Sequence, residues 1–118
     1  MKILGYILAI IIALGGVSHF LTPEMFLPFI PDFLPAEFVN YASGLVEIMV
    51  GLGYFIPSYR KLSAQSMLIL MVAFLPLHVI DVFIENPAIG SKTVAYIRLP
   101  IQFLLIYWAW KVFKFNQN

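Results

Sequence analysis

Four long apolar stretches constrain the fold of this chain more than any other feature of its sequence. They cover residues 3–21, 38–56, 62–84 and 94–113. Each is close to the roughly 20 apolar residues that a helix needs to cross the hydrocarbon core of a bilayer. Because lipid offers no partners to backbone N–H and C=O groups, such segments must be helical. The sequence predicts an all-α fold: an integral membrane four-helix bundle with antiparallel up-and-down topology, in one transmembrane domain over residues 1–118.

Charged residues are scarce in this sequence. They make up 11% of the chain, whereas hydrophobic residues make up 62%; a typical soluble domain has about 25% charged residues. We therefore expect the lipid bilayer to be the main partner. A net charge of +1 without a basic stripe argues against nucleic-acid binding. The chain has no cysteine, so it supplies neither disulfides nor thiolate ligands.

The distribution of charge predicts which ends of the helices face the cytoplasm. In a four-pass hairpin, one side carries Lys2, Arg60, Lys61, Lys111 and Lys114. The other side carries Glu24, Asp32, Glu37, Glu85 and a single basic residue, Lys92. An excess of Lys and Arg marks the cytoplasmic side of a membrane protein. Both termini are therefore predicted to be cytoplasmic, in a multi-pass protein of the plasma or inner membrane.

The first apolar stretch has a second interpretation. Lys2, an apolar run and the small residues around Ala13 and Gly15 also resemble a cleaved signal peptide. The run is long for a signal peptide, and His19 at its end has a use inside a bundle. We therefore favour a retained first helix.

The first connection, residues 22–37, is rich in both proline and apolar residues. Pro23, Pro28, Pro31 and Pro35 break it too often for a membrane span. Its apolar side chains are unsuited to open water, so we expect an ordered loop at the outer interface. A second interpretation is a lid over the outer mouth of the bundle.

Polar residues inside the apolar stretches are the candidate functional residues. A charged side chain at the centre of a membrane helix costs about 2.5–3.5 kcal/mol on insertion, so such residues face the bundle interior and usually have partners. At 1.5 Å of rise per residue, five of these polar residues lie about 5–15 Å from the outer ends of their helices. They are His19, Glu47, His78, Arg98 and Gln102. The candidate cluster, for a ligand pocket or a buried ion pair, consists of His19, Ser43, Glu47, His78, Arg98 and Gln102.

Within this cluster the natural ion pair joins Glu47 to Arg98, with Gln102 as a bridge. Such a pair has two interpretations: a structural contact that fixes helix register, or part of a pocket for a polar or redox-active molecule. Asp81 lies one turn from His78 and could orient its ring. His19 and His78 are each interpreted first as hydrogen-bonded structural residues. Haem ligation by the pair is a weaker alternative, and no metal site is predicted.

Several segments together resemble the DoxX-like family of small four-helix membrane proteins. The most specific are Ser-Gly-Leu-Val-Glu at residues 43–47 and Arg-Leu-Pro-Ile-Gln at residues 98–102. Others are Gly15–Phe20, Phe29-Ile30-Pro31, Phe33-Leu34-Pro35, Gly51-Leu52-Gly53 and Pro76-Leu77-His78. The resemblance implies a four-helix membrane fold and carries the family's motif positions onto Ser43, Gly44, Glu47, His78, Arg98 and Gln102. Some members of that family are subunits of thiosulfate:quinone oxidoreductase, and a distant relative is an assembly chaperone for acetylcholine receptors.

Three hypotheses for function follow. The first is an accessory or binding subunit of a quinone-linked membrane redox system, with quinone as the candidate ligand and a membrane or peripheral redox protein as the partner. The second is a structural or chaperone-type membrane protein without a small-molecule ligand. The third and weakest is a transporter, which the absence of inverted repeats disfavours. The residues identify no catalytic centre, so independent enzymatic activity is not expected. A homo-oligomer is compatible with all three.

Overall fold

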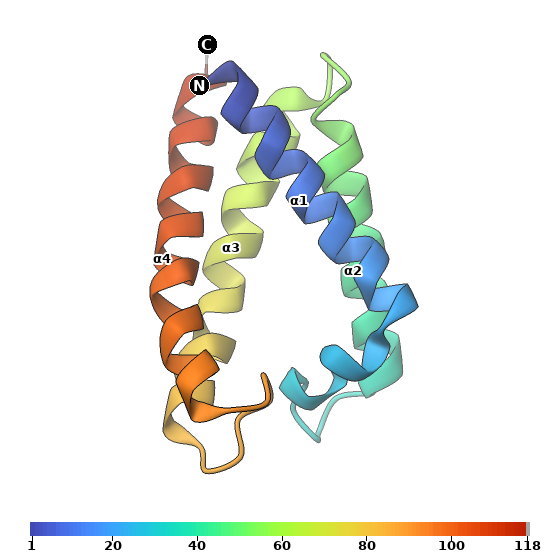
Figure 1. The fold of residues 1–118 in the computed structure, drawn as a ribbon. Helices are drawn as coiled ribbons and strands as arrows, with labels where there is room; N and C mark the ends of the chain where they lie inside the picture. The colour runs from blue at the N-terminus through green and yellow to red at the C-terminus, as the bar shows by residue number, and fades with distance from the viewer. Residues whose placement is uncertain (118) are drawn as a thin grey trace.

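Four long α-helices form the protein, and the computed structural model describes residues 1–117 of the chain (Figure 1). The helices are α1 (Lys2–Leu21), α2 (Ala36–Gly53), α3 (Arg60–Phe83) and α4 (Lys92–Phe115). Two short 3-10 turns, η1 (Pro23–Met25) and η2 (Leu27–Phe29), lie between α1 and α2. No strand occurs within residues 1–117. The prediction of an all-α fold is confirmed.

The helices overlap the four apolar stretches, with one clear difference at the end of α2. This helix ends at Gly53, three residues before the end of the apolar stretch. The N–H groups of Phe55 and Ile56 donate to the carbonyls of Leu52 and Gly53, which lie three residues earlier instead of four. The backbone after Gly53 is therefore wound more tightly than an α-helix. Hydrophobicity continues beyond Gly53, but the helical hydrogen bonding does not.

Two of the four helices are long and apolar enough to cross a membrane by length and composition. These are α1, with a mean hydropathy of 2.1, and α3, with a mean hydropathy of 2.2. From the four apolar stretches, we expected all four helices to qualify. Polar residues lower the hydropathy of the other two helices, notably Asn40 and Glu47 in α2 and Arg98 and Gln102 in α4.

The helices associate as two hairpins, α1 with α2 and α3 with α4. Glycines bring α1 and α2 into backbone contact: a Cβ atom on Gly16 would lie 2.5 Å from the carbonyl oxygen of Gly44, and one on Gly51 would lie 2.6 Å from that of Ala9. Small residues at a crossing allow two helices this close approach. The α1–α2 crossing therefore leaves no room for larger side chains at Gly16, Gly44 or Gly51.

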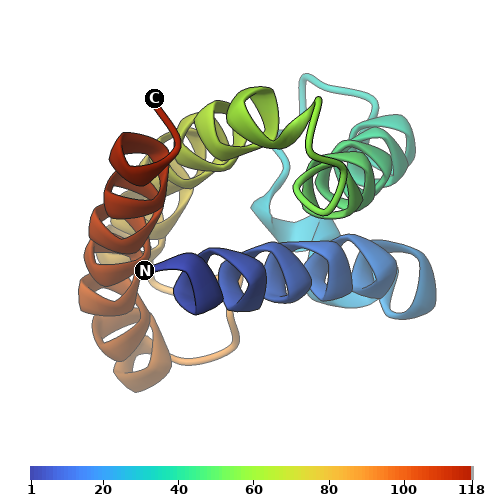
Figure 2. The ribbon, with the colours of Figure 1, turned by 90° about the horizontal axis from the view of Figure 1, so that it is seen from above.

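The two hairpins meet at the end of the molecule that carries both termini, and diverge toward the other end (Figures 1 and 2). At the shared end, the Trp108 indole N–H donates to the carbonyl of Leu4 at 3.0 Å, and the Asn116 amide donates to the Tyr54 hydroxyl at 2.9 Å. The main apolar core lies in this half and includes Leu8, Ile12, Tyr54, Met67 and Val112. The opposite half holds the polar residues of the candidate site.

Candidate functional site

His19 and Asn40 form a closed pair of hydrogen bonds between the end of α1 and the beginning of α2. The Asn40 amide nitrogen donates to the backbone carbonyl of His19 at 2.9 Å. This bond fixes the orientation of the amide, so that its oxygen faces the ring nitrogen Nδ1 of His19 at 2.7 Å. Since an amide oxygen only accepts, Nδ1 must carry a proton and donate it.

Glu47 completes this network two helical turns beyond Asn40 on α2. Its Oε2 atom lies 2.7 Å from the other ring nitrogen, Nε2 of His19. The contact lacks the alignment of a hydrogen bond, so it is a close polar contact rather than a linear bond.

Burial and small neighbours explain why these three side chains lie together. The exposed fractions are 8% for His19, 1% for Asn40 and 6% for Glu47. A Cβ atom on Gly44 would lie 2.6 Å from the His19 Cβ, and one on Gly15 would lie 3.2 Å from the Glu47 Oε1. The glycines that bring the helices together therefore also make the space that the polar side chains occupy.

The expected ion pair between Glu47 and Arg98 does not form. Within residues 1–117, the ionic partner of Glu47 is His19. The physical reason is the arrangement of the hairpins: Glu47 belongs to α1–α2 and Arg98 to α3–α4, and these diverge at this end (Figure 1). Helical periodicity identified the inward face of each helix but not how far apart the faces would be.

Arg98 and Gln102 lie one turn apart on α4, and both have buried atoms without partners. Gln102 is fully buried, and its amide nitrogen donates to the backbone carbonyl of Met71 on α3 at 2.6 Å. Its Oε1 atom and the Nη1 atom of Arg98 are buried and have no hydrogen-bond partner in the described structure. One is an acceptor and the other a donor, so a single hydroxyl group has the chemistry to satisfy both.

Asp81 does not orient His78, contrary to the prediction. Its two carboxylate oxygens accept the backbone N–H groups of Ala88 and Ile89, in the connection between α3 and α4. The carboxylate is 2% exposed and satisfies amides that have no other partner there. Asp81 is therefore a structural residue that fixes this connection.

The proline-rich connection covers both histidines. The Phe26 ring stacks on the His19 ring with centroids 3.8 Å apart and planes inclined by 20°. The Phe29 ring meets the half-buried His78 edge-on, with centroids 5.5 Å apart. Two aromatic residues three positions apart thus contact one histidine in each hairpin.

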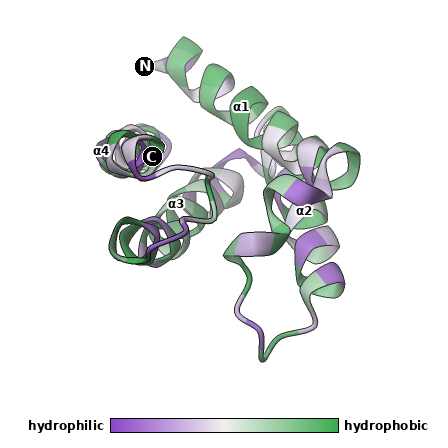
Figure 3. Ribbon diagram, turned by 60° about the horizontal axis from the view of Figure 1, so that its bottom comes forward, coloured by the Kyte–Doolittle hydropathy of each residue, from purple (hydrophilic) through white to green (hydrophobic). Residues whose placement is uncertain are grey.

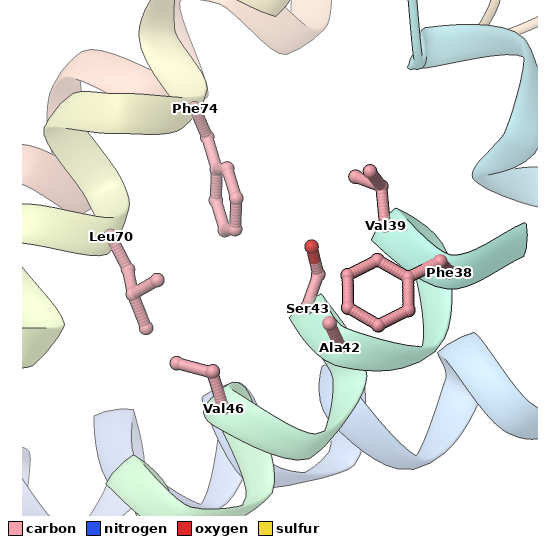
Figure 4. A pocket seen from close by; sticks show the side chains of 7 residues that line it. All are labelled: Phe38, Val39, Ala42, Ser43, Val46, Leu70 and Phe74. Atoms are coloured by element: carbon pink, nitrogen blue, oxygen red, sulfur yellow. The ribbon is translucent and has the colours of Figure 1, made fainter. Parts of the chain in front are cut away.

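Ser43 lies apart from these polar residues, in a shallow groove of about 290 Å³ between α2 and α3. In Figure 4 its hydroxyl group points into the space between the two helices. The rest of the lining is apolar and comes from Phe38, Val39, Ala42, Val46, Leu70 and Phe74. The six predicted site residues therefore separate into His19 with Glu47, a set on α3–α4 (His78, Arg98 and Gln102), and Ser43.

Three residues of the site were missing from the predicted set: Asn40, Phe26 and Phe29. Asn40 had a usable signal, because it lies seven residues before Glu47 and so shares its helical face. The two phenylalanines had none beyond their place among prolines, since sequence spacing does not show how a loop folds back. No three His, Asp or Glu side chains come together as metal ligands in the part of the chain described.

Comparison with known families assigns the chain to a different group from the one its motifs suggested. A family model described as a domain of unknown function, DUF8561, matches residues 8–113. The chain belongs to the DUF8561 family. The resemblance to the DoxX-like family was therefore wrong. The segments behind it are short, and any membrane helix with small residues near one inward polar group can carry similar ones.

Searches of curated proteins and of solved structures found no match to this DUF8561 member. Its function must therefore be inferred from the geometry of its own residues.

A double-mutant cycle tests the pairing of Glu47. We expect His19→Gln and Glu47→Gln to be coupled by about 1–3 kcal/mol, because the two side chains are in direct contact. Glu47→Gln and Arg98→Gln should be additive within about 0.5 kcal/mol, because they share no partner. The measurement is the free energy of unfolding in SDS-containing mixed micelles. Strong coupling of Glu47 to Arg98, with none to His19, would contradict this geometry.

Proposed function

We propose that the protein is an integral membrane protein whose four helices all cross the bilayer. The support is the apolar surface that the helices leave uncovered. Only 33% of the apolar window of α1 and 22% of that of α3 is buried, unlike the core helix of a soluble protein. Apolar residues occur along all four helices (Figure 3), and an exposed surface of this kind is stable in lipid.

The lower hydropathy of α2 and α4 fits the same proposal. Of their strongly polar residues, Asn40, Glu47 and Gln102 are buried inside the protein and Arg98 is half-buried. Their outward faces are apolar: Leu45 is 54% exposed and Leu104 is 67% exposed. A membrane helix whose polar groups face its neighbours has a low mean hydropathy and still presents an apolar surface to lipid.

We further propose that both termini lie in the cytoplasm, at a plasma or inner membrane. Lys2, Lys111 and Lys114 lie near the termini, which are at one end of the molecule (Figure 1). Arg60 and Lys61, in the connection between α2 and α3, belong to the same side in an up-and-down arrangement. This excess of basic residues favours a cytoplasmic position.

Cysteine labelling tests this topology, and the chain suits it because it has no cysteine of its own. We expect Asn86→Cys, in the α3–α4 connection, to react with a membrane-impermeant maleimide added to intact cells. Ser58→Cys, in the α2–α3 connection, should react only after the membrane is permeabilised. Both positions are exposed, so access depends on sidedness. Labelling of both variants in intact cells would contradict the proposed crossing.

Within the membrane, we propose that the protein acts as a binding subunit for an amphiphile with a hydroxyl-bearing head group. Two buried atoms without hydrogen-bond partners, Arg98 Nη1 and Gln102 Oε1 one turn apart on α4, carry this proposal. Leaving a buried donor or acceptor unsatisfied costs about 1–3 kcal/mol, and more when the group is charged. A head group that accepts from Arg98 and donates to Gln102 would remove both costs.

A quinol is the head group that we favour, because each of its hydroxyls both donates and accepts. The bilayer supplies such molecules from the side, and their apolar tails suit a protein whose outer faces are apolar. In this role the protein would be an accessory subunit that presents quinol to a redox partner, without catalysing a reaction itself.

A structural or assembly role is the second candidate, and a separate observation favours it. His19 contacts both Asn40 and Glu47 across the α1–α2 interface, and all three side chains are buried. Such a network would set the geometry of a scaffold. It does not use Arg98 or Gln102, so the two candidates can be separated by experiment.

Thermal unfolding with a short-chain benzoquinol tests the binding role. A saturating ligand at 100 times its Kd stabilises the folded protein by about 2.7 kcal/mol, which would raise Tm. We expect Arg98→Gln and Gln102→Leu each to raise the quinol concentration that gives half of the Tm shift at least tenfold. The reason is that each variant removes one hydrogen bond to the head group.

Arg60→Gln is the matched control. Arg60 is the only other arginine of the chain, and its Nε–H already donates to the Tyr54 carbonyl at 2.8 Å. This variant should keep the full response to quinol. A Tm unaffected by quinol, together with no small molecule extracted from gently purified protein, would reject the binding role and favour the structural one.

A further inference from the structure

The end of the molecule that carries the termini has a strongly one-sided charge. Five of the seven basic residues lie there: Lys2, Arg60, Lys61, Lys111 and Lys114. All six acidic residues lie elsewhere, in the proline-rich connection, within α2, or near the end of α3. We name this region the basic end. Its charges have no acidic neighbours to neutralise them, so they are available to an anionic partner.

A groove of about 240 Å³ opens at the basic end, between the beginning of α1 and the last turns of α4. Its lining is Met1, Leu4, Tyr107, Trp108 and Lys111. The Trp108 indole N–H donates to the Leu4 carbonyl, which fixes one wall of the groove and ties the two helices together. The atoms that line the groove are therefore apolar, and Lys111 is the one lining residue whose side chain ends in a charged group.

Lys111 presents its charge beside aromatic rings rather than to a carboxylate. Its Nζ atom lies 5.8 Å from the centroid of the Tyr107 ring and 5.9 Å from that of the Trp110 ring. No carboxylate lies within 4.0 Å of it in the described part of the chain. The ammonium group has three donors, and the rings use none of them as ordinary hydrogen bonds. Its hydrogen-bonding capacity thus remains for a ligand.

We propose that this groove binds an anionic phospholipid, with part of one acyl chain against its apolar wall and the phosphate at Lys111. The proposal rests on the membrane location proposed above, and is independent of the Arg98–Gln102 site. A zwitterionic lipid is a poorer match, because no Asp or Glu side chain of the described residues lies at the basic end to pair with its cationic group. Anionic lipids also gain from the neighbouring basic residues, since each basic residue near the surface adds to their attraction.

Fluorescence quenching by brominated lipids tests the proposal, because the chain has two tryptophans, Trp108 and Trp110. Trp108 lines the groove, and the Trp110 ring lies beside the Lys111 ammonium group. The full chain is reconstituted into phosphatidylcholine vesicles that contain a varied fraction of brominated phosphatidylglycerol or brominated phosphatidylcholine. We expect the phosphatidylglycerol to bind about fivefold more tightly, as one added charge contact predicts.

Two variants identify the source of this selectivity. Lys111→Gln should abolish it, whereas Lys61→Gln, an exposed residue of the same basic end outside the groove, should retain most of it. Equal quenching by the two lipids would overturn the proposal, and so would an equal loss of selectivity in both variants. Absence of quenching by either lipid would instead reject the membrane location itself.

Discussion

The close approach of α1 and α2 is the constraint on which the polar site depends. Gly16 and Gly44 allow the two backbones to touch, and this contact brings His19 against Asn40 and Glu47. Burying these groups separately would cost free energy, because each would lose its hydration without gaining a partner. Together they compensate one another, and the stacked ring of Phe26 covers them. A crossing with larger residues would separate the helices and leave all three side chains without partners.

The buried polar side chains of the two hairpins have different partners, and this difference suggests separate roles. In α1–α2, His19 contacts both Asn40 and Glu47, although the Glu47 Oε2 atom makes no aligned hydrogen bond. In α3–α4, Gln102 uses its amide nitrogen on the Met71 carbonyl while its oxygen and the Arg98 Nη1 have no partner. The proline-rich connection contacts both hairpins through Phe26 and Phe29. It therefore contacts one histidine of each hairpin at the same end of the molecule.

The sequence predicted the helices and the identity of most polar residues, but not how those residues pair. Apolar length and helical periodicity depend on each segment alone. The four helices, and the burial of the helix faces that carry Glu47 and Gln102, could therefore be inferred. Pairing depends on the angle between hairpins, which no local pattern encodes, and so Glu47 was assigned to Arg98 instead of His19. Asp81 was predicted to orient the His78 ring, because sequence spacing does not locate the backbone amides of Ala88 and Ile89 that its carboxylate accepts. The resemblance to the DoxX-like family was wrong because it rested on short motifs, which do not identify a family by themselves.

We propose that lipid surrounds all four helices, including α2 and α4, whose polar residues lower their hydropathy. Spin-label accessibility in reconstituted vesicles measures this directly, with single cysteines at Leu45 and Leu104 in the middle of these helices and Ile69 of α3 as a reference. All three positions are more than half exposed. We expect oxygen to reach each label readily, whereas a water-soluble nickel complex should not. If the nickel complex reached labels at positions 45 and 104 as freely as a label at position 58 in the α2–α3 connection, water would surround these helices and the proposed membrane location would be contradicted.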